Sequence, residues 1–323
     1  MTSAFFLGVD GGGTKTRFAL MDGDKTLVAE AQLGTSYHPE VGLDGVRDVL
    51  TKGVAEVLAR AGTDAAHVAF AFFGLPGYGE DSKATPVLQS LPASILAHDR
   101  YVVDNDMVCG WAGSLGAEDG INIVAGTGSI GYGQRRGRSA RAGGWGEAFS
   151  DEGSAYWLAM QGLNAFSRMS DGRLPKGPLH TLIHESLKLQ DDLDLCAQVY
   201  GSGGRSRGEL AQLSPLIATA AGLGDVAALD IFRRAGQELA QIAEALRQKL
   251  DYEAGEAVRL SYSGGAFNAG DLLIKPFQEA LTAANSAFEA SRPLHDPHYG
   301  AALYAAKLSQ LRGSASTSAS HRR

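Results

Sequence analysis

The sequence predicts an α/β protein built from two similar halves with a cleft between them. Apolar, strand-like runs alternate with amphipathic helical stretches along most of the chain. A unit of strand, glycine-rich turn and strand at residues 5–21 has an echo at residues 121–134. The chain has 323 residues, which is enough for two domains of ordinary size. We therefore expect a doubled architecture.

The first half is predicted to form a mixed sheet with helices. Three strands come first, and a turn at Asp22-Gly23-Asp24 separates the second strand from the third. Apolar residues then recur at three-to-four spacing, which indicates a helix with one buried stripe, and further strands and helices alternate. The predicted strands are 5–10, 16–21, 27–31, 67–74 and 100–106, and the helical stripe covers 46–58.

The second half begins with two strands and is then mostly helical. Its predicted strands are 121–125, 129–134 and 258–268, and its clearest helices are 225–250 and 299–311. We expect an N-terminal lobe over 1–117 and a C-terminal lobe with a helical insertion over 118–298. We expect a C-terminal helix at about 299–312 to pack back on the first lobe. The tail, 313–323, has no apolar side chain larger than alanine and is predicted to be disordered.

Composition excludes several classes of protein. The formal net charge of −7 argues against nucleic acid or an anionic membrane as the main partner. Two distant cysteines, Cys109 and Cys196, predict neither a disulfide framework nor a cysteine-rich metal site. There is no recognisable secretory signal and no apolar run of about 18 residues. We expect a cytoplasmic protein, and we interpret the arginines at 135–141 as a solvated turn.

The first candidate site is VDGGGTKT, from Val9 to Thr16. Gly11, Gly12 and Gly13 leave a tight turn free of side chains, so that backbone N–H groups can approach phosphate oxygens. Thr14 and Lys15 add a hydroxyl and a cation, and Asp10 can hold a hydrated magnesium ion. The alternative is a hairpin that merely needs glycine. Because a strand follows the glycines, this is neither a Walker loop nor a dinucleotide fingerprint.

Two later glycine turns could complete a nucleotide site. Gly126, Thr127 and Gly128 lie in AGTGS, again between two predicted strands. Paired with the first turn, they would supply a second set of backbone donors for a triphosphate. Gly264 and Gly265 follow a strand and permit close approach of a flat ring or ribose. Each of these two turns alone is also compatible with an ordinary loop.

The segment VVDND, from Val102 to Asp106, ends a predicted buried strand. A carboxylate at the edge of a cleft can accept the proton of a sugar hydroxyl as that oxygen attacks phosphorus. Asp104 and Asp106 are both candidates for this base. The alternative is that Asn105 or Asp106 caps the helix that follows.

The segment GGWGEAFSDEGSAYW, from Gly143 to Trp157, has the chemistry of a sugar site. Trp145 supplies an apolar face on a flexible backbone, and Asp151 supplies a hydroxyl acceptor. The alternative is that Asp151 caps a helix while Trp145 and Trp157 belong to the core. For Trp157, on the predicted helix, the core interpretation is preferred.

Taken together and in this order, the segments resemble the BadF/BadG family of ATPases, and within it the N-acetylglucosamine kinases. The resemblance covers residues 5 to 310, and DGGGTKT, AGTGS and GGWG followed by DEGSAYW are its most specific parts. It implies the two-lobed actin-like ATPase fold, related to ribonuclease H, with a central cleft. It also implies ATP and Mg²⁺ as cofactors and an amino sugar as substrate, phosphorylated on its 6-hydroxyl.

The resemblance also implies a role for individual residues. Thr14 and Thr127 would contact ATP phosphates, and Asp10 would serve magnesium. Asp106 matches the catalytic carboxylate of the family. The family segment that holds the amino sugar is matched here by Gly143, Gly144, Trp145 and Asp151. The family turn that binds adenosine is matched by Gly264 and Gly265.

The loop after the third strand departs from the family pattern. Relatives usually have a sugar-contacting asparagine there, whereas this chain has Ser36, Tyr37 and His38. Ser36 or Tyr37 could replace its hydrogen bond. Pro76 and Tyr78 also stand where a small hydroxyl residue is common.

The choice between sugars depends on one tryptophan. Relatives that phosphorylate unacetylated glucosamine tend to lack the tryptophan of GGWG, and an acetyl methyl group suits an indole face, so Trp145 favours N-acetylglucosamine. Glucosamine is the alternative substrate. A homodimer is common among relatives and is expected as one option here.

Two other classes compete with a sugar kinase. The family includes activator ATPases that bridge a dimer with an iron–sulfur cluster, but Cys109 and Cys196 do not match the local motifs of that branch. A non-catalytic, sugar-sensing ATP-binding protein is the other class. The presence of both Asp10 and Asp106 favours an enzyme.

Overall fold

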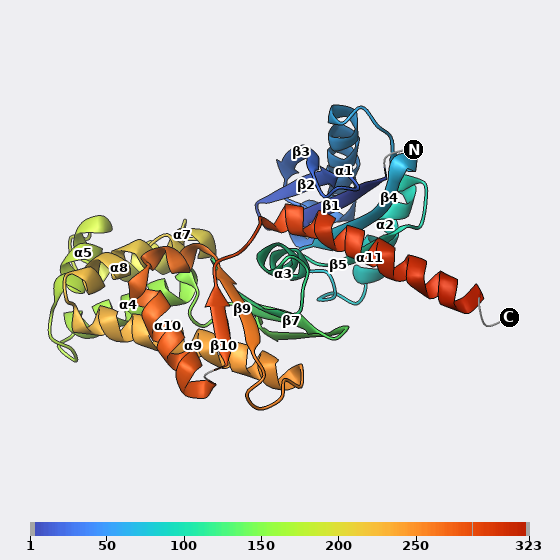
Figure 1. The fold of residues 1–323 in the computed structure, drawn as a ribbon. Coiled ribbons are helices and arrows are strands. Elements are labelled where there is room, and N and C mark those ends of the chain that lie inside the picture. Colours follow the sequence, from blue (N-terminus) through green and yellow to red (C-terminus); the bar gives the residue numbers. More distant parts are fainter. Residues whose placement is uncertain (1–3, 286, 321–323) are drawn as a thin grey trace. The chain divides into compact units, whose positions relative to one another are not determined.

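The computed structural model describes residues 4–285 and 287–320, and the chain divides into two compact units. Unit 1 consists of Met1–Asp119 together with Pro293–Arg323, and unit 2 consists of Gly120–Arg292. Each unit contains its own five-stranded sheet (Figure 1). The fold is therefore mixed α/β, as the sequence predicts.

The sheet of unit 1 has the strand order β3-β2-β1-β4-β5, in which β1, β2 and β3 are antiparallel neighbours and β4 and β5 run parallel to β1. Its elements are β1 (Phe5–Gly11), β2 (Lys15–Met21), β3 (Leu27–Gly34), α1 (His38–Arg60), a short 3₁₀ helix η1 (Ala65–His67), β4 (Val68–Leu75), α2 (Thr85–Leu96), β5 (Tyr101–Asn105), α3 (Met107–Leu115) and α11 (Pro297–Ser320).

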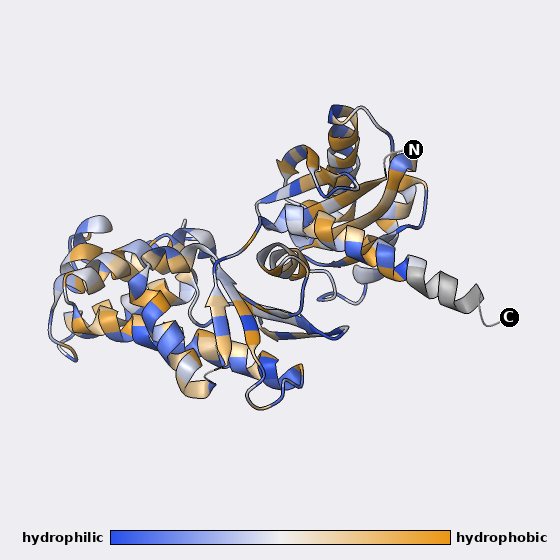
Figure 2. Ribbon diagram, in the orientation of Figure 1, coloured by the Kyte–Doolittle hydropathy of each residue, from blue (hydrophilic) through white to orange (hydrophobic). Residues whose placement is uncertain are grey.

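Alternating side chains of the unit 1 sheet serve two layers. Leu7, Val9 and Phe18 pack with α1 and α2 in one core cluster. Ala19 and Met21 point to the other face, where they pack against α11. That helix approaches closely, since a Cβ on Gly8 would lie 2.2 Å from the backbone nitrogen of Ala302. The central strands are coloured mostly as hydrophobic in Figure 2, as burial on both faces requires.

The sheet of unit 2 has the order β10-β9-β6-β7-β8. Its strands are β6 (Gly120–Ala125), β7 (Ser129–Arg135), β8 (Arg138–Gly143), β9 (Val258–Ser263) and β10 (Phe288–Ser291). Its helices are α4 (Ala155–Ser170), α5 (Pro178–Ser186), α6 (Asp194–Tyr200), α7 (Arg207–Ala211), α8 (Ser214–Gly222), α9 (Val226–Lys249), the 3₁₀ helix η2 (Gly265–Ala269) and α10 (Asp271–Ala284). One core cluster joins the sheet to α4, α8, α9 and α10.

The two sheets have the same topology. In each, three consecutive antiparallel strands are followed by two strands parallel to the first, so β6 to β10 correspond in order to β1 to β5. Between the third and fourth strands, unit 1 inserts α1 and η1, whereas unit 2 inserts α4 to α9. The predicted echo of residues 5–21 at 121–134 is confirmed.

Several local predictions need correction. The strand expected over 258–268 ends at Ser263, because the Gly264 backbone (φ +104°) starts a 3₁₀ helix. The strands β8 and β10 are short and weakly apolar, and the sequence pattern missed them. The predicted tail, 313–323, continues α11 as far as residue 320, with no proline to end the helix. Residues 321–323 lie outside the described residues.

Arg135 is buried rather than solvated. Its side chain is 6% exposed, lies 2.6 Å from a Glu256 carboxylate oxygen and donates a hydrogen bond to the Asp251 carbonyl oxygen at 2.8 Å. A buried guanidinium is tolerated when its N–H groups find acceptors in this way. Arg136 and Arg138 of the same turn are largely exposed, as expected.

Over the described parts of the chain, no single helix combines the length and the apolar character needed to cross a membrane. The helical segments Arg207–Gly222 and Val226–Lys249 meet the length and composition limits only when counted together, and they are bent by 118° at the break between them.

Candidate active site

The glycine turn of unit 1 is a hairpin whose tip is open to ligands. The Gly12 N–H donates to the Lys15 carbonyl oxygen at 2.9 Å, and the Thr35 hydroxyl donates to the Gly12 carbonyl oxygen at 2.8 Å. These bonds fix the base of the turn, while Gly13, Thr14 and Lys15 are exposed. The hydroxyl and ammonium groups of the turn are therefore available to an anionic ligand.

The residues beneath this turn explain why it needs glycine. A Cβ on Gly11 would lie 2.4 Å from the Ser36 hydroxyl oxygen and 2.8 Å from Pro76 Cδ. Ser36 is 1% exposed, and its hydroxyl has no hydrogen-bond partner among the described residues. Tyr37 is half-buried, with its ring against that of His38. Of the two predicted sugar contacts in this loop, Tyr37 is thus the more accessible.

Asp10 and Asp106 lie close together at the carboxyl ends of β1 and β5, the two strands on either side of β4. Asp10 pairs with Gly74 across β1 and β4, and a Cβ on Gly74 would lie 3.2 Å from the Asp106 Cα. Asp106 occupies the N-cap position of α3 but makes no side-chain capping bond. The Asn105 side chain accepts the bond from the Met107 N–H instead, at 3.2 Å. The Asp106 carboxylate is therefore not used as a helix cap.

Burial and neighbouring negative charge raise the pKa values of the acidic groups near the ends of β1 and β5. Burial, reinforced by the Asp106 charge, raises the pKa of Asp10 to about 7. Burial also raises the pKa of the Cys109 thiol, whose sulfur lies 3.5 Å from the Val9 carbonyl oxygen. The pKa of Asp104 is raised by burial as well, although this carboxylate accepts a 2.7 Å bond from the Asn105 N–H. Carboxylates with raised pKa values at a strand edge are typical of functional sites.

The carboxylates of unit 1 fit a magnesium ion held jointly with phosphate. Two neighbouring acidic groups that repel each other gain from a cation between or beside them. Among residues 4–285 and 287–320, no three His, Cys, Asp or Glu side chains form a group that could hold a metal alone. Mg²⁺ needs no such cage, because it is usually bound through one or two carboxylates, water and substrate phosphates.

The glycine turn of unit 2 is tied to the first turn of a helix. The Gly126 N–H donates to the Gly128 carbonyl oxygen at 2.9 Å. The carbonyl oxygens of Gly126 and Thr127 accept bonds from the N–H groups of Ala155 and Tyr156, at 2.9 and 3.3 Å. These N–H groups belong to the start of α4 and would otherwise lack partners. The turn is thereby fixed by the helix.

The second and third glycine turns meet in unit 2. The strands β6 and β9 are parallel, and Val124 pairs with Ser263, so both strands end at the same edge of the sheet. A Cβ on Gly264 would lie 2.4 Å from the Ala125 carbonyl carbon, which leaves no room for another residue. Gly265 has no atom in contact range of such a Cβ. The two turns predicted to bind ATP thus lie side by side, where ligands of α/β sheets commonly bind.

The GGWG segment exposes an aromatic ring beside a cavity. Gly143 and Gly144 both have φ of +69°, which favours glycine, and the Trp145 side chain that follows is 74% exposed. Trp145 is therefore not part of the core. It lines a cavity of about 410 Å³ together with Ala142, Gly143, Phe149, Ser150, Glu152, Glu238, Gln241, Ile242 and Ala245. An aromatic face with carboxylates suits a sugar.

Asp151 is buried and held in an unusual backbone conformation. It is 3% exposed with φ of +62°, accepts a bond from the Ser129 N–H at 3.4 Å and lies 2.5 Å from an Arg207 nitrogen. Burial raises the pKa of this carboxyl, and the Arg207 charge opposes the shift. Ser154 caps α4, so Asp151 does not. Trp157 packs against the core, as expected.

Sequence reasoning missed Arg207. The pattern from Ser206 to Glu209 forms a capping box, so the start of α7 was detectable in the sequence. The partner of Arg207 could not be identified from the sequence, because Asp151 lies 56 positions away along the chain. Sequence reasoning also missed the Glu152 and Glu238 side of the Trp145 cavity.

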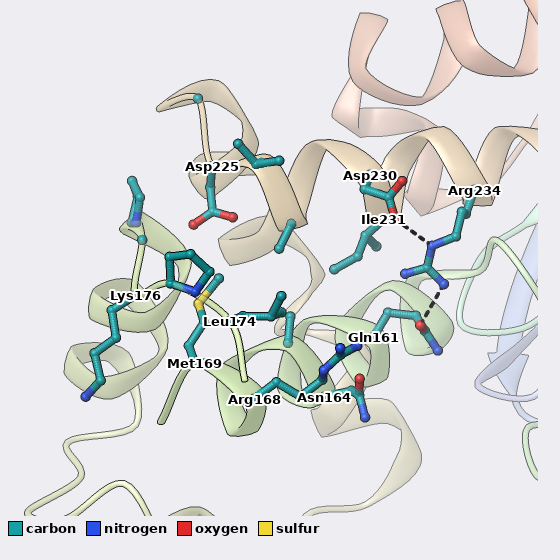
Figure 3. A pocket seen from close by; sticks show the side chains of 17 residues that line it. Gln161, Asn164, Arg168, Met169, Leu174, Lys176, Asp225, Asp230, Ile231 and Arg234 are labelled. Atoms are coloured by element: carbon teal, nitrogen blue, oxygen red, sulfur yellow. Dashed lines mark hydrogen bonds and ion pairs between the residues drawn. The ribbon is translucent and has the colours of Figure 1, made fainter. Parts of the chain in front are cut away.

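A second cavity, of about 560 Å³, lies among the helices of unit 2 (Figure 3). Met169, Leu174 and Ile231 form part of its apolar wall. On one side Arg234 binds Asp230 and Gln161, both at 3.0 Å. No prediction falls on this cavity.

The comparisons with known proteins cover nearly the whole chain. The model of the BadF/BadG/BcrA/BcrD ATPase family matches residues 7–305. The N-acetyl-D-glucosamine kinase of Dictyostelium discoideum is 30% identical, over 94% of this chain and 98% of its own length. The N-acetylmuramic acid/N-acetylglucosamine kinase of Clostridium acetobutylicum is 28% identical, over 93% of this chain and 98% of its own.

The solved structures agree on the fold. A protein of Chromobacterium violaceum, described provisionally as an N-acetylglucosamine kinase, has a TM-score of 0.67 at 24% identity. The match covers 95% of this chain and 100% of that one. The predicted actin-like α/β fold is confirmed, and the chain belongs to the BadF/BadG/BcrA/BcrD ATPase family.

Proposed function

We propose that this ATP-dependent sugar kinase phosphorylates the 6-hydroxyl of N-acetylglucosamine. The observation that carries the proposal is the pair of carboxylates, Asp10 and Asp106, at the ends of β1 and β5 on either side of β4, in the unit that carries an open glycine turn. Relatives named for N-acetylglucosamine at 28% and 30% identity support the choice of sugar.

Glycine turns in each unit supply candidate contacts for ATP. In unit 1 the phosphate contacts are Gly11, Gly12, Gly13, Thr14 and Lys15, and in unit 2 they are Gly126, Thr127 and Gly128, with Gly264 and Gly265 near the adenosine. The backbone N–H groups of glycine residues suit this role, because glycine has no side chain that would block the approach of a phosphate oxygen. Asp10 would hold Mg²⁺, which neutralises charge on the phosphates.

Asp106 would act as the general base. Its carboxylate accepts the proton of the sugar 6-hydroxyl while that oxygen forms a bond to the γ-phosphorus. The bond from the γ-phosphorus to the bridging oxygen breaks at the same time, and ADP leaves. A carboxylate that does not cap the following helix can serve as the acceptor of this proton.

In unit 2 the proposed amino-sugar contacts are Gly143, Gly144, Trp145 and Asp151. In unit 1 the candidate sugar contact is Ser36 or Tyr37. The exposed indole of Trp145 offers an apolar face for the acetyl methyl group. Between the two unit 1 residues, the accessibility of Tyr37 favours it. Glucosamine, which lacks the methyl group, is the alternative substrate.

A coupled ADP-release assay with ATP and Mg²⁺ tests the proposal. The panel consists of N-acetylglucosamine, glucosamine, N-acetylmuramic acid, N-acetylmannosamine and glucose. We expect turnover with N-acetylglucosamine and phosphorus NMR of a 6-phosphate product. A preference for glucosamine would retain the kinase and reject the role of Trp145, whereas no turnover with any sugar favours a non-catalytic sugar sensor. Light scattering would test the expected homodimer.

A further inference from the structure

Arg207 stands at the first position of α7, on a helix start that is fixed independently of any ligand. The Ser206 hydroxyl accepts a bond from the Glu209 N–H, and the Glu209 carboxylate accepts one from the Ser206 N–H. This reciprocal pair satisfies two N–H groups of the helix start. The backbone that carries Arg207 is therefore preorganised.

The Arg207 side chain lies against two segments that the proposed function uses, the sugar segment and the phosphate turn of unit 2. One guanidinium nitrogen lies 2.5 Å from the Asp151 carboxylate, and the other lies 3.3 Å from that of Glu147 in the GGWGE segment. A Cβ on Gly128 would lie 2.5 Å from the same guanidinium and 2.7 Å from the Asp151 carboxylate. Arg207 thus touches the phosphate turn and the sugar segment at once.

Asp151 needs such a partner. Its carboxylate is almost fully buried, and its backbone has a positive φ, which is rare for a residue other than glycine. A buried carboxylate without a cation is strongly disfavoured in its charged form. Positive-φ residues persist only where the surroundings hold them, and they gather at functional sites.

We propose that Arg207 is a positioning residue, which holds the Asp151 carboxylate ionised and correctly oriented to accept a hydrogen bond from the sugar. The inference rests on the proposed function, since it assumes that Asp151 binds the sugar. Arg207 itself does not touch the reacting atoms. Its contact with Gly128 gives the sugar site a fixed relation to the phosphate turn of the same unit.

The charged groups around Asp151 give the inference a pH signature. Arg207 faces it from α7, while Glu147 and Glu152 face it from its own segment and raise its pKa. Without the guanidinium, the pKa of Asp151 would rise further, so that a larger fraction of the carboxyl would be protonated at a given pH. Raising the pH would then ionise it and restore sugar binding.

Arg207→Gln, Arg207→Lys and a matched control test the proposal. Arg173→Gln removes the same charge from another Arg–Asp pair, since Arg173 binds the partly exposed Asp171 at 2.6 Å. We expect Arg207→Gln to raise the KM for N-acetylglucosamine about 10- to 100-fold, with a smaller effect on kcat, because a buried charge loses its partner. The raised KM should fall as the pH is raised from 6 to 8.5. Arg207→Lys should recover part of the loss, and Arg173→Gln should behave as wild type.

Carbon-detected NMR titration of the Asp151 carboxyl gives a readout that does not depend on turnover. Arg207→Gln should move the titration of Asp151 to higher pH, while thermal unfolding shows that the variant is folded. An unchanged KM, or an Asp151 titration that does not move, would overturn the inference. Absence of wild-type turnover with every amino sugar would instead reject the proposed function, and the NMR titration would still test the Arg207–Asp151 pair.

Discussion

The two units share one sheet topology, yet their glycine turns have different surroundings. Each turn connects the first two antiparallel strands of its sheet, over Gly12–Thr14 in unit 1 and Gly126–Gly128 in unit 2. In unit 1 the strand before the turn carries Asp10 next to its last residue, whereas in unit 2 the strand ends on Ala125. The carboxylates of the proposed chemistry therefore belong to unit 1.

The turn of unit 2 is instead supported by its insertion. The helix α4 donates N–H groups to the carbonyl oxygens of Gly126 and Thr127, and Arg207 of α7 lies against Gly128. Unit 1 has only α1 and η1 at the corresponding place in its topology. The two units thus share a hairpin of the same topology, and in unit 2 the inserted helices contact the glycine turn. The four predictions below test this division of labour.

The largest effect is expected when the base in unit 1 is removed. Asp106→Asn should lower kcat about 10²- to 10⁴-fold, because no carboxylate remains to accept the hydroxyl proton. The KM for the sugar should change far less. Asp104→Asn is the matched control, since Asp104 lies on the same strand end and its carboxylate is bonded to the Asn105 N–H. Near-normal turnover of Asp106→Asn, or a larger loss in Asp104→Asn, would contradict the assignment.

The contact between the two glycine turns of unit 2 comes next. Gly264→Ala places a methyl group 2.4 Å from the Ala125 carbonyl carbon at a φ of +104°, and it should lower the free energy of unfolding by about 1–3 kcal/mol. We also expect a KM for ATP raised about tenfold or more, since displacement of the turn weakens several contacts.

The neighbouring glycine supplies the control for this experiment. Gly265 has open space at its Cβ position. Gly265→Ala should therefore leave urea unfolding close to wild type. Equal destabilisation by the two substitutions would show that the close approach of Gly264 to Ala125 does not cause the loss of stability.

The exposed indole of unit 2 should affect specificity rather than stability. Trp145→Ala is expected to raise the KM for N-acetylglucosamine about tenfold, through loss of the aromatic contact with the acetyl group. The KM for glucosamine should change little, and the thermal midpoint should stay constant, because the side chain is 74% exposed. Trp157→Ala, which removes a ring packed on the core, should lower the midpoint. A parallel loss for both sugars would remove Trp145 from the acetyl pocket.

The smallest effect concerns pH and the helical insertion. Although burial acts to raise it, the pKa of Asp192 is lowered to about 2 by hydrogen bonds from His180, Lys176 and Ser170. A depressed carboxyl pKa stabilises the fold above the unfolded pKa of about 4, and this stability is lost as the pH falls towards 2. Asp192→Asn should cost about 1 kcal/mol at pH 7, allowing for solvent screening. Urea unfolding should show that the difference shrinks as the pH falls from about 5 towards 2. A difference that stays constant over this range would assign it to packing.

Much of the fold follows from local pattern. The alternation of apolar residues predicts the strands of both sheets, and three-to-four spacing predicts α1 and α9. The repeated hairpin predicts two similar units, since similar patterns bury similar surfaces. Short, weakly apolar strands such as β8 and β10 escaped prediction, because they depend on neighbours in the sheet rather than on their own residues.

The sequence alone also determined the chemistry of the candidate site, in the glycine turns, the acidic strand ends and the GGWG segment. Tertiary structure decided which of these groups are accessible and how they are paired. It buries Ser36 under Gly11, lets Asn105 rather than Asp106 bond the helix start, and joins Asp151 to Arg207 across 56 positions. Turn and strand preferences act between near neighbours in the chain, whereas burial and ion pairing depend on distances that only the folded chain sets.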